Sequence, residues 1–128
     1  MNYLPTHQEY LNRRATLLHF GTWVVPAYFT SIIDEHTAVR TNAGLFDISH
    51  MGIFEVTGSD ALAFLQYVST NDVTRLADGK ALYALLCNEE GGIIDDIFIY
   101  RFNQNRFFVI VNAGNSDKDY AWLTRIEP

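Results

Sequence analysis

The alternation of apolar and polar residues predicts three strands in the second half of the chain. Apolar segments at 81–88, 93–102 and 106–112 are separated by Glu90-Gly91-Gly92 and by Asn103-Gln104-Asn105. These residues tolerate the backbone conformations that tight turns need. We therefore expect a three-stranded antiparallel meander.

Four helices are predicted, at about 6–14, 31–42, 59–68 and 116–126; the last three carry apolar residues that fit one side of a helix. Residues that favour helix N-termini stand at each start: Thr6 with Glu9, Thr30 or Ser31, Ser59, and Asn115 or Ser116 with Asp119 as the far member of a capping box. Gly44 is placed to end the second helix. Residues around 20–23 are expected to form a loop that ends at Pro26, and 45–56 are expected to be extended. Together these elements predict an α+β fold with a mostly antiparallel sheet.

Length and composition favour one globular domain over 1–128. The chain has 128 residues, of which 48% are hydrophobic and 19% charged, with a formal net charge of −6. An acidic chain without a cluster of Lys and Arg is a poor partner for nucleic acid or for an anionic membrane. Cys87 is the only cysteine, which favours a reducing compartment. We therefore expect a cytoplasmic protein, with neither a signal peptide nor a membrane span.

Two adjacent carboxylates, Asp95 and Asp96, interrupt an otherwise apolar strand. Side chains alternate along a strand, so Asp96 shares a face with Phe98, Tyr100 and Phe102, while Asp95 lies on the other face. A carboxylate on an apolar face is costly unless it is hydrogen-bonded or neutralised.

A turn centred on Gln104 places Asn112 opposite Asp96, with Phe98 opposite Ile110. An amide in that position can satisfy the carboxylate and orient a ligand, although a one-residue slip would abolish the pairing. The alternative is structural, because paired aspartates beside a Gly-Gly turn often only solvate a strand end.

Other candidate sites are weaker. Asp47, Ser49 and His50 lie too close together in an extended segment to converge as a catalytic triad. The histidines have no ligand-like spacing with Cys87 or the carboxylates, so no metal site is expected. Lys80 and Arg75 could meet an anionic ligand, but surface solvation is the simpler role.

Several motifs in order resemble the T-protein of the glycine cleavage system, an aminomethyltransferase, in its N-terminal portion. The resemblance covers nearly the whole chain and is carried by 31–40, 43–52, 70–73, 79–83, Asn88, 91–96, Tyr100, 111–113, 117–119 and Trp122.

The resemblance implies tetrahydrofolate-dependent chemistry. The family transfers an aminomethyl unit from a lipoyl arm, carried on a small partner protein, to tetrahydrofolate, with release of ammonia and formation of 5,10-methylenetetrahydrofolate. It implies that Asp96 is the catalytic carboxylate, and that Met51, Tyr83, Asp96, Tyr100 and Asn112 belong to the folate pocket. We expect Asp96 to act as a buried negative charge in a dry cleft, where it would stabilise a developing cation or move a proton.

Members of the family are much longer than this chain, and their later parts complete the pocket. The resemblance therefore leaves several expectations open. The chain could retain folate one-carbon chemistry and complete its pocket as a homo-oligomer. Without the lipoyl carrier, it could hydrolyse 5,10-methylenetetrahydrofolate to tetrahydrofolate and formaldehyde. It could also be a non-catalytic folate-binding module, or an inactive fragment.

Overall fold

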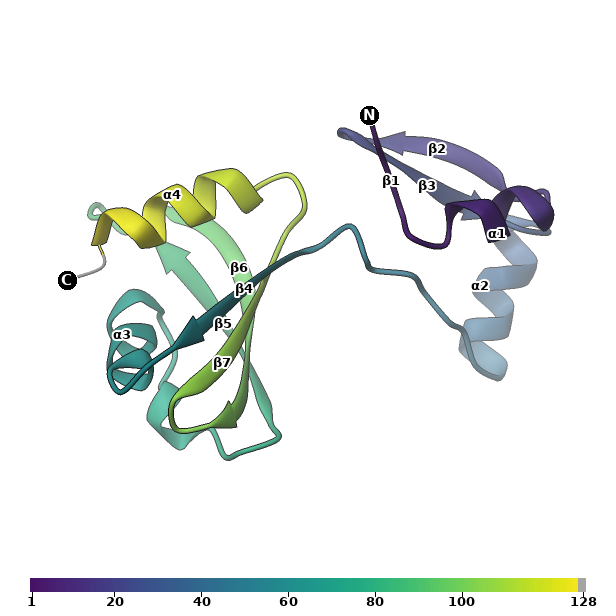
Figure 1. Ribbon diagram of the computed structural model, residues 1–128. Coiled ribbons are helices and arrows are strands. Elements are labelled where there is room, and N and C mark those ends of the chain that lie inside the picture. The colour runs from purple at the N-terminus through teal and green to yellow at the C-terminus, as the bar shows by residue number, and fades with distance from the viewer. Residues whose placement is uncertain (127–128) are drawn as a thin grey trace. The chain divides into compact units, whose positions relative to one another are not determined.

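The computed structural model describes residues 1–126 as two compact units, 1–50 and the residues from Met51 onward. Each unit is described by itself (Figure 1). The single domain expected over 1–128 stays a prediction.

The first unit is a small sheet with two helices. In chain order it contains β1 (Asn2–Tyr3), α1 (His7–Asn12), β2 (Thr16–Phe20), β3 (Trp23–Tyr28) and α2 (Ile32–Thr41). The central strand β3 pairs with β1 in parallel and with β2 in antiparallel orientation.

The loop expected around 20–23 is the turn of the β2–β3 hairpin, and it contains Gly21 at a φ of +59°. The expectation that this loop continues to Pro26 was wrong, because Pro26 lies within β3. The β1 strand pairs only with Trp23 and Val24, which leaves one side of Pro26 without a neighbouring strand. A proline is tolerated at such an edge position.

The start of α2 follows the prediction, whereas two other helix ends do not. The Asp34 backbone N–H donates to Ser31 Oγ over 3.0 Å, as a Ser N-cap requires. Asn42, and not Gly44, follows the last residue of α2. The capping box at Thr6 was also wrong, since Thr6 makes no side-chain cap bond and its hydroxyl contacts Asp47 instead.

The second unit contains a four-stranded antiparallel sheet in the order β4-β7-β6-β5 (Figure 1). Its elements are β4 (Gly52–Thr57), α3 (Ala61–Val68), a 3₁₀ turn η1 (Val73–Arg75), β5 (Ala81–Cys87), β6 (Ile93–Asn103), β7 (Arg106–Val111) and α4 (Ser116–Ile126). The α+β class and the three-stranded meander are therefore confirmed. Of the extended segment expected at 45–56, only the part from Gly52 is a strand.

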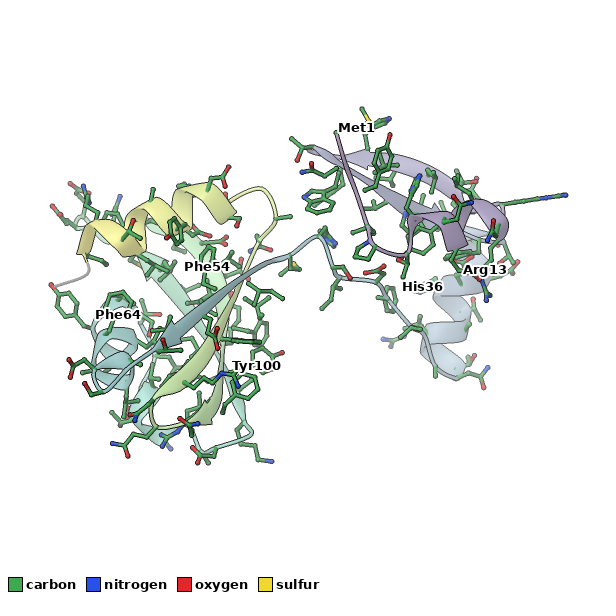
Figure 2. All side chains as sticks on the ribbon, in the orientation of Figure 1. Met1, Arg13, His36, Phe54, Phe64 and Tyr100 are labelled. Atoms are coloured by element: carbon green, nitrogen blue, oxygen red, sulfur yellow. The ribbon has the colours of Figure 1, made fainter. Side chains whose placement is uncertain are left out.

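The helices α3 and α4 cover one face of this sheet and close a continuous apolar core. The core consists of Ala61, Leu65, Val68, Val73, Leu76, Ala84, Leu86, Ile97, Ile99, Phe107, Val109, Val111 and Leu123. Figure 2 shows Phe54 on the side of α4 and Tyr100 on the other side of the sheet. Gly52 permits close packing of α4, because a Cβ there would lie 2.6 Å from Ser116 Oγ.

Two expected caps in this unit are wrong. Asp60, and not Ser59, precedes the first turn of α3, and it makes no side-chain cap bond. Asp119 does not complete a capping box, because its side chain is fully buried on the inner side of α4.

Candidate functional site

The β6–β7 register is the one that the sequence predicts. Phe98 pairs with Ile110, and Tyr100 pairs with Phe108. Alternation along β6 buries Asp95 on the core side at 3% exposure and leaves Asp96 exposed on the opposite face. The two neighbouring carboxylates therefore face different surroundings.

Asn112 joins these two carboxylates from the residue that follows β7. Its Nδ2 donates to Asp95 Oδ1 over 2.9 Å and to Asp96 Oδ1 over 3.0 Å. The same nitrogen lies 3.2 Å from the Asp96 backbone oxygen. The contact predicted between Asn112 and Asp96 is thus present.

Asp95 is enclosed by amide donors. Its Oδ2 accepts from the Asn112 backbone N–H over 3.0 Å, and its Oδ1 also accepts from Asn115 Nδ2 over 2.6 Å. Burial by itself would raise the pKa of Asp95. The hydrogen bonds from Asn112, Asp119 and Asn115 outweigh that effect and hold this pKa below its ordinary value.

Asp96 lies on the face of the sheet that α3 and α4 do not cover, which we call the open face. The open face carries exposed or half-buried side chains of Ile53, Tyr83, Leu85, Asp96, Phe98, Tyr100, Phe102, Phe108 and Ile110. The ring of Phe98 lies 5.4 Å from that of Tyr83 and 6.4 Å from that of Tyr100, measured between centroids. Partial burial and the neighbouring charge of Asp96 raise the pKa of Tyr83.

Four of the five residues predicted for the folate pocket thus gather around one part of this sheet. Tyr83 is on β5, Asp96 and Tyr100 are on β6, and Asn112 directly follows β7. Met51, half-buried, immediately precedes Gly52, which pairs with Val111, the neighbour of Asn112. The ligand contacts of all five residues remain predictions.

The expectation that Asp96 is a buried charge was wrong. Both faces of β6 look apolar in the sequence, but the apolar sides of α3 and α4 cover only the face that contains Asp95. A flat ligand stacked on the open face would itself displace water from around Asp96, and electrostatic interactions strengthen as water is removed.

Asp47, Ser49 and His50 form no triad. Asp47 Oδ1 accepts from the Ser49 backbone N–H over 2.9 Å, and its Oδ2 accepts from the hydroxyls of Thr6 and Tyr10. Burial opposes ionisation of Asp47, but these hydrogen bonds dominate and hold its pKa well below the ordinary range. This carboxylate therefore ties the segment after α2 to α1.

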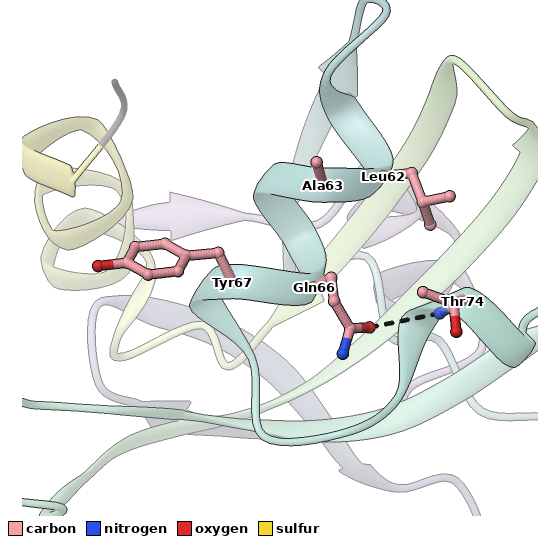
Figure 3. Close-up of a pocket in the computed structure, with 5 residues that line it drawn as sticks. All are labelled: Leu62, Ala63, Gln66, Tyr67 and Thr74. Atoms are coloured by element: carbon pink, nitrogen blue, oxygen red, sulfur yellow. Dashed lines mark hydrogen bonds between the residues drawn. The ribbon is translucent and has the colours of Figure 1, made fainter.

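Two shallow hollows lie on the second unit, and neither includes Asp96. Leu62, Ala63, Gln66, Tyr67 and Thr74 line the first (Figure 3). Gln66 Oε1 accepts from the backbone N–H groups of Val73 and Thr74, at 2.7 and 3.3 Å, so this amide fastens η1 to α3. The second hollow lies where α3 and α4 approach β4.

Within residues 1–126, no group of three or more His, Cys, Asp or Glu side chains is arranged to hold a metal ion. None of the helices described there is long and apolar enough to cross a membrane.

Sequence reasoning gave Asn115 and Asp119 only as helix-capping candidates and missed their contacts with Asp95. Asp119 precedes Leu123 by four residues and Ile126 by seven. That helical spacing already places its carboxyl on the inner side of α4, and it was the signal that could have identified this residue.

The fold and the site define a class of protein: an α+β domain with an antiparallel sheet that presents one amide-anchored carboxylate among exposed aromatic side chains. Comparison with known proteins identifies the family. Residues 6–128 match the family model described as the GCVT N-terminal domain, and the chain belongs to this family. The resemblance to the T-protein is thereby confirmed.

Named relatives agree with this assignment. Proteins named aminomethyltransferase from two strains of Staphylococcus epidermidis are each 50% identical over 121 residues, which make up 94% of this chain and 33% of theirs. A crystal structure of glycine cleavage system aminomethyltransferase T from Bartonella henselae has 37% identity and a TM-score of 0.91. That match covers 97% of this chain and 35% of the other. The chain thus spans about a third of the length of these relatives, and it is aminomethyltransferase-like in sequence and fold.

Proposed function

We propose that this chain binds a reduced folate on the open face of its second unit, and that Asp96 serves one-carbon chemistry there. The observation that carries the proposal is the position of Asp96, a carboxylate anchored by Asn112 among exposed aromatic rings. Membership of a family whose relatives are named aminomethyltransferases supports the same reading.

The residues of the open face suit a flat, partly polar ligand. Tyr83, Phe98 and Tyr100 are 49%, 44% and 44% exposed, so their rings are accessible for stacking. Patches of exposed apolar side chains often mark a binding surface. Asp96 and the Tyr83 hydroxyl add polar groups that can pair with the edge of a heterocycle.

A reduced folate, when bound, supplies a secondary amine that can accept a one-carbon unit. Asp96 would hold a fixed negative charge beside a carbon that becomes electron-poor as ammonia leaves. Such a charge stabilises the transition state without reorganisation, and the carboxylate could also exchange a proton with the amine. We infer that the one-carbon unit is the aminomethyl group of a lipoyl carrier.

Thermal stability in the presence of 5-methyltetrahydrofolate tests the binding step. A ligand that binds only the folded state must raise the melting temperature. We expect Tyr100→Ala to reduce this rise and Tyr67→Ala to leave it unchanged, because Tyr67 is an exposed tyrosine on α3, away from the open face. A wild-type melting temperature that does not change at saturating ligand would contradict folate binding.

The Asp96→Asn variant tests the chemistry. It keeps the shape of the side chain and removes the charge, so we expect folate binding to survive and turnover to fall by about 10²-fold or more. Turnover is followed as ammonia released from an aminomethyl-lipoyl donor. Asp60→Asn is the matched control, since Asp60 makes no cap bond. Equal turnover in Asp96→Asn and wild type would refute the assigned role.

The exposure of Asp96 favours a second candidate, a folate-binding module without catalysis. The two candidates differ in turnover and not in binding. Release of ammonia supports aminomethyl transfer, release of formaldehyde from 5,10-methylenetetrahydrofolate supports hydrolysis, and neither supports the binding module. Light scattering with and without ligand would show whether a homo-oligomer forms and whether the ligand changes its mass.

A further inference from the structure

Asp119 is a fully buried carboxyl group that the proposed chemistry does not use. It lies on α4 at 0% exposure. Within the part of the chain that the structure describes, neither of its oxygens receives a hydrogen bond from an amide, a hydroxyl or a cation. Asp119 lies one helical turn beyond Asn115, whose side-chain amide donates to Asp95 Oδ1 over 2.6 Å, and this places the Asp119 carboxyl group beside that of Asp95 on β6.

Two ionised carboxylates in this position would repel each other and could not form a hydrogen bond. One proton on Asp119 removes the repulsion and supplies the missing donor. Burial, the hydrogen bond to Asp95 and the charge of Asp95 together raise the pKa of Asp119 to about 7. Because the pair is coupled, the proton belongs to both carboxyl groups.

No other group described near this pair neutralises the second negative charge in place of the proton. Lys118 precedes Asp119 on α4, but its Nζ donates to the Ile94 backbone oxygen over 2.7 Å. Asp96 and Tyr83 lie toward the open face. Asn112 and Asn115, which follow β7, donate to Asp95 through amide groups, which carry no charge.

Hydrogen bonds lead from this pair to the proposed reactive carboxylate. Asp95 accepts from both the backbone and the side chain of Asn112, which fixes the side-chain amide. That amide in turn donates to Asp96 Oδ1. A change in the charge or position of Asp95 therefore alters the hydrogen bond that Asp96 accepts, because Asn112 contacts both carboxylates.

We propose that Asp119 is a positioning residue for Asp96: it shares a proton with Asp95, and the protonated pair holds Asn112 in the orientation that fixes the Asp96 carboxylate. The role assigned to Asp96 rests on the proposed function, whereas the shared proton and its effect on Asn112 do not. Loss of the proton would leave two adjacent buried negative charges, and Asn112 would move as Asp95 shifts to relieve their repulsion.

Nuclear magnetic resonance of the full chain without ligand tests the shared proton. With ¹³C-labelled aspartate, we expect one carboxyl signal of the pair to titrate near neutral pH, far above the exposed aspartates. The Asn112 side-chain amide signals should shift with the same midpoint. A pair that titrates with the exposed aspartates, or Asn112 signals that do not change with pH, would overturn the proposal.

Two variants separate positioning from general stability. In Asp119→Asn an amide donates to Asp95 at every pH, so the Asn112 signals should stay close to their protonated wild-type position and lose their pH dependence. In Asp119→Leu the donor is lost, and the signals should be displaced at every pH. The exposed Asp117→Asn on α4 is the control and should keep the wild-type titration. If Asp119→Leu does not fold, Asp119→Asn is sufficient. Asn112 signals that still shift with pH near neutrality in Asp119→Asn would reject the proposal.

Titration of the same samples with 5-methyltetrahydrofolate links the pair to the site. At pH 6 we expect Asp119→Asn to bind this folate as wild type does. Between pH 6 and 8 the affinity of the variant should stay constant, whereas the affinity of wild type should fall. If wild type binds no folate, the proposed function fails while the shared proton is still measured. If binding is normal and equally independent of pH in wild type and Asp119→Asn, the positioning role fails by itself.

Discussion

The two units of the chain are stabilised in different ways. Residues 1–50 bury only Leu4, Tyr10 and Val24 among their apolar side chains, whereas the second unit closes a continuous apolar core under its sheet. The first unit leaves Ile32 and Ile33 exposed on α2. Its order depends more on polar bonds, such as those that enclose Asp47.

The carboxyl groups show the same difference. Asp47 receives bonds from two hydroxyls and a backbone N–H, so it is stabilised as an anion. Asp119 has only another carboxyl group as its partner, so it is stabilised as an acid. Burial raises the pKa of both groups, but Asp47 is only half-buried and has three donors, whereas Asp119 is fully buried and has none of these.

Removal of a core side chain from the second unit should give the largest loss in the free energy of unfolding. Removal of an apolar side chain from the first unit should cost much less. Phe107 is 0% exposed, and Phe107→Ala should cost about 3–5 kcal/mol of the free energy of unfolding. Ile33 is 72% exposed, and Ile33→Ala should change it by about 0.5 kcal/mol or less. Urea unfolding measures both losses, through Trp122 fluorescence in a Trp23→Phe background for Phe107→Ala and through Trp23 fluorescence in a Trp122→Phe background for Ile33→Ala. Similar losses in both variants would contradict the difference between the units.

The stability of the two units should depend on pH with opposite signs. The folded-state pKa of Asp119 is raised from 3.8 to about 7, so its contribution is fully present below pH 3.8 and is lost as pH rises through about 7. The pKa of Asp47 is lowered, so its contribution is present above 3.8 and is lost as pH falls through the folded value.

Melting curves between pH 4 and 8 would show this contrast. We expect the melting temperature reported by Trp122 to fall as pH rises, and the one reported by Trp23 to change little. Asp119→Asn should flatten the first dependence. A wild-type protein whose Trp122 signal reports rising stability over this range would exclude a protonated Asp119.

Removing the Asp47 side chain should destabilise the first unit alone. Asp47→Ala leaves Thr6, Tyr10 and Ser49 without their acceptor, at a cost of about 1–3 kcal/mol. The loss is measured through Trp23 in a Trp122→Phe background. Asp34→Asn, at an exposed carboxylate on α2, should cost much less. A loss that Trp122 reports equally in the Trp23→Phe background would show that this bond network is not local.

The smallest expected change in stability comes from the helix caps. Ser31→Ala removes an observed cap bond on α2 and should cost about 1 kcal/mol. Asp60→Ala on α3 removes no such bond and should cost clearly less. Helix content and urea midpoints of the two variants measure the difference. An equal cost would mean that the Ser31 bond contributes little to stability.

Local patterns predicted much of the second unit. The β6–β7 register followed from turn residues and alternation, and it brought Asn112 to Asp96. The Ser31 cap could also be predicted from the sequence, because the backbone N–H that donates to it lies three residues away, at Asp34. These features depend on short separations along the chain.

Features that depend on packing were not predictable in this way. The sequence could not show which face of β6 the helices cover, so Asp96 was wrongly expected to be buried. Asp119 was taken for a capping-box residue because it lies three residues after Ser116, whereas the packing of α4 on the sheet buries it. The β2–β3 hairpin was missed because Pro26 argued against a strand.

The Asn112 side chain has one more consequence for recognition. Its amide nitrogen has two hydrogens, and both are engaged by the oxygens of Asp95 and Asp96. Its Oδ1, a hydrogen-bond acceptor, is therefore the atom that can bind a ligand. Together with the anionic Asp96, it would select heterocycles that present N–H groups along the docked edge and disfavour analogues that present lone pairs there.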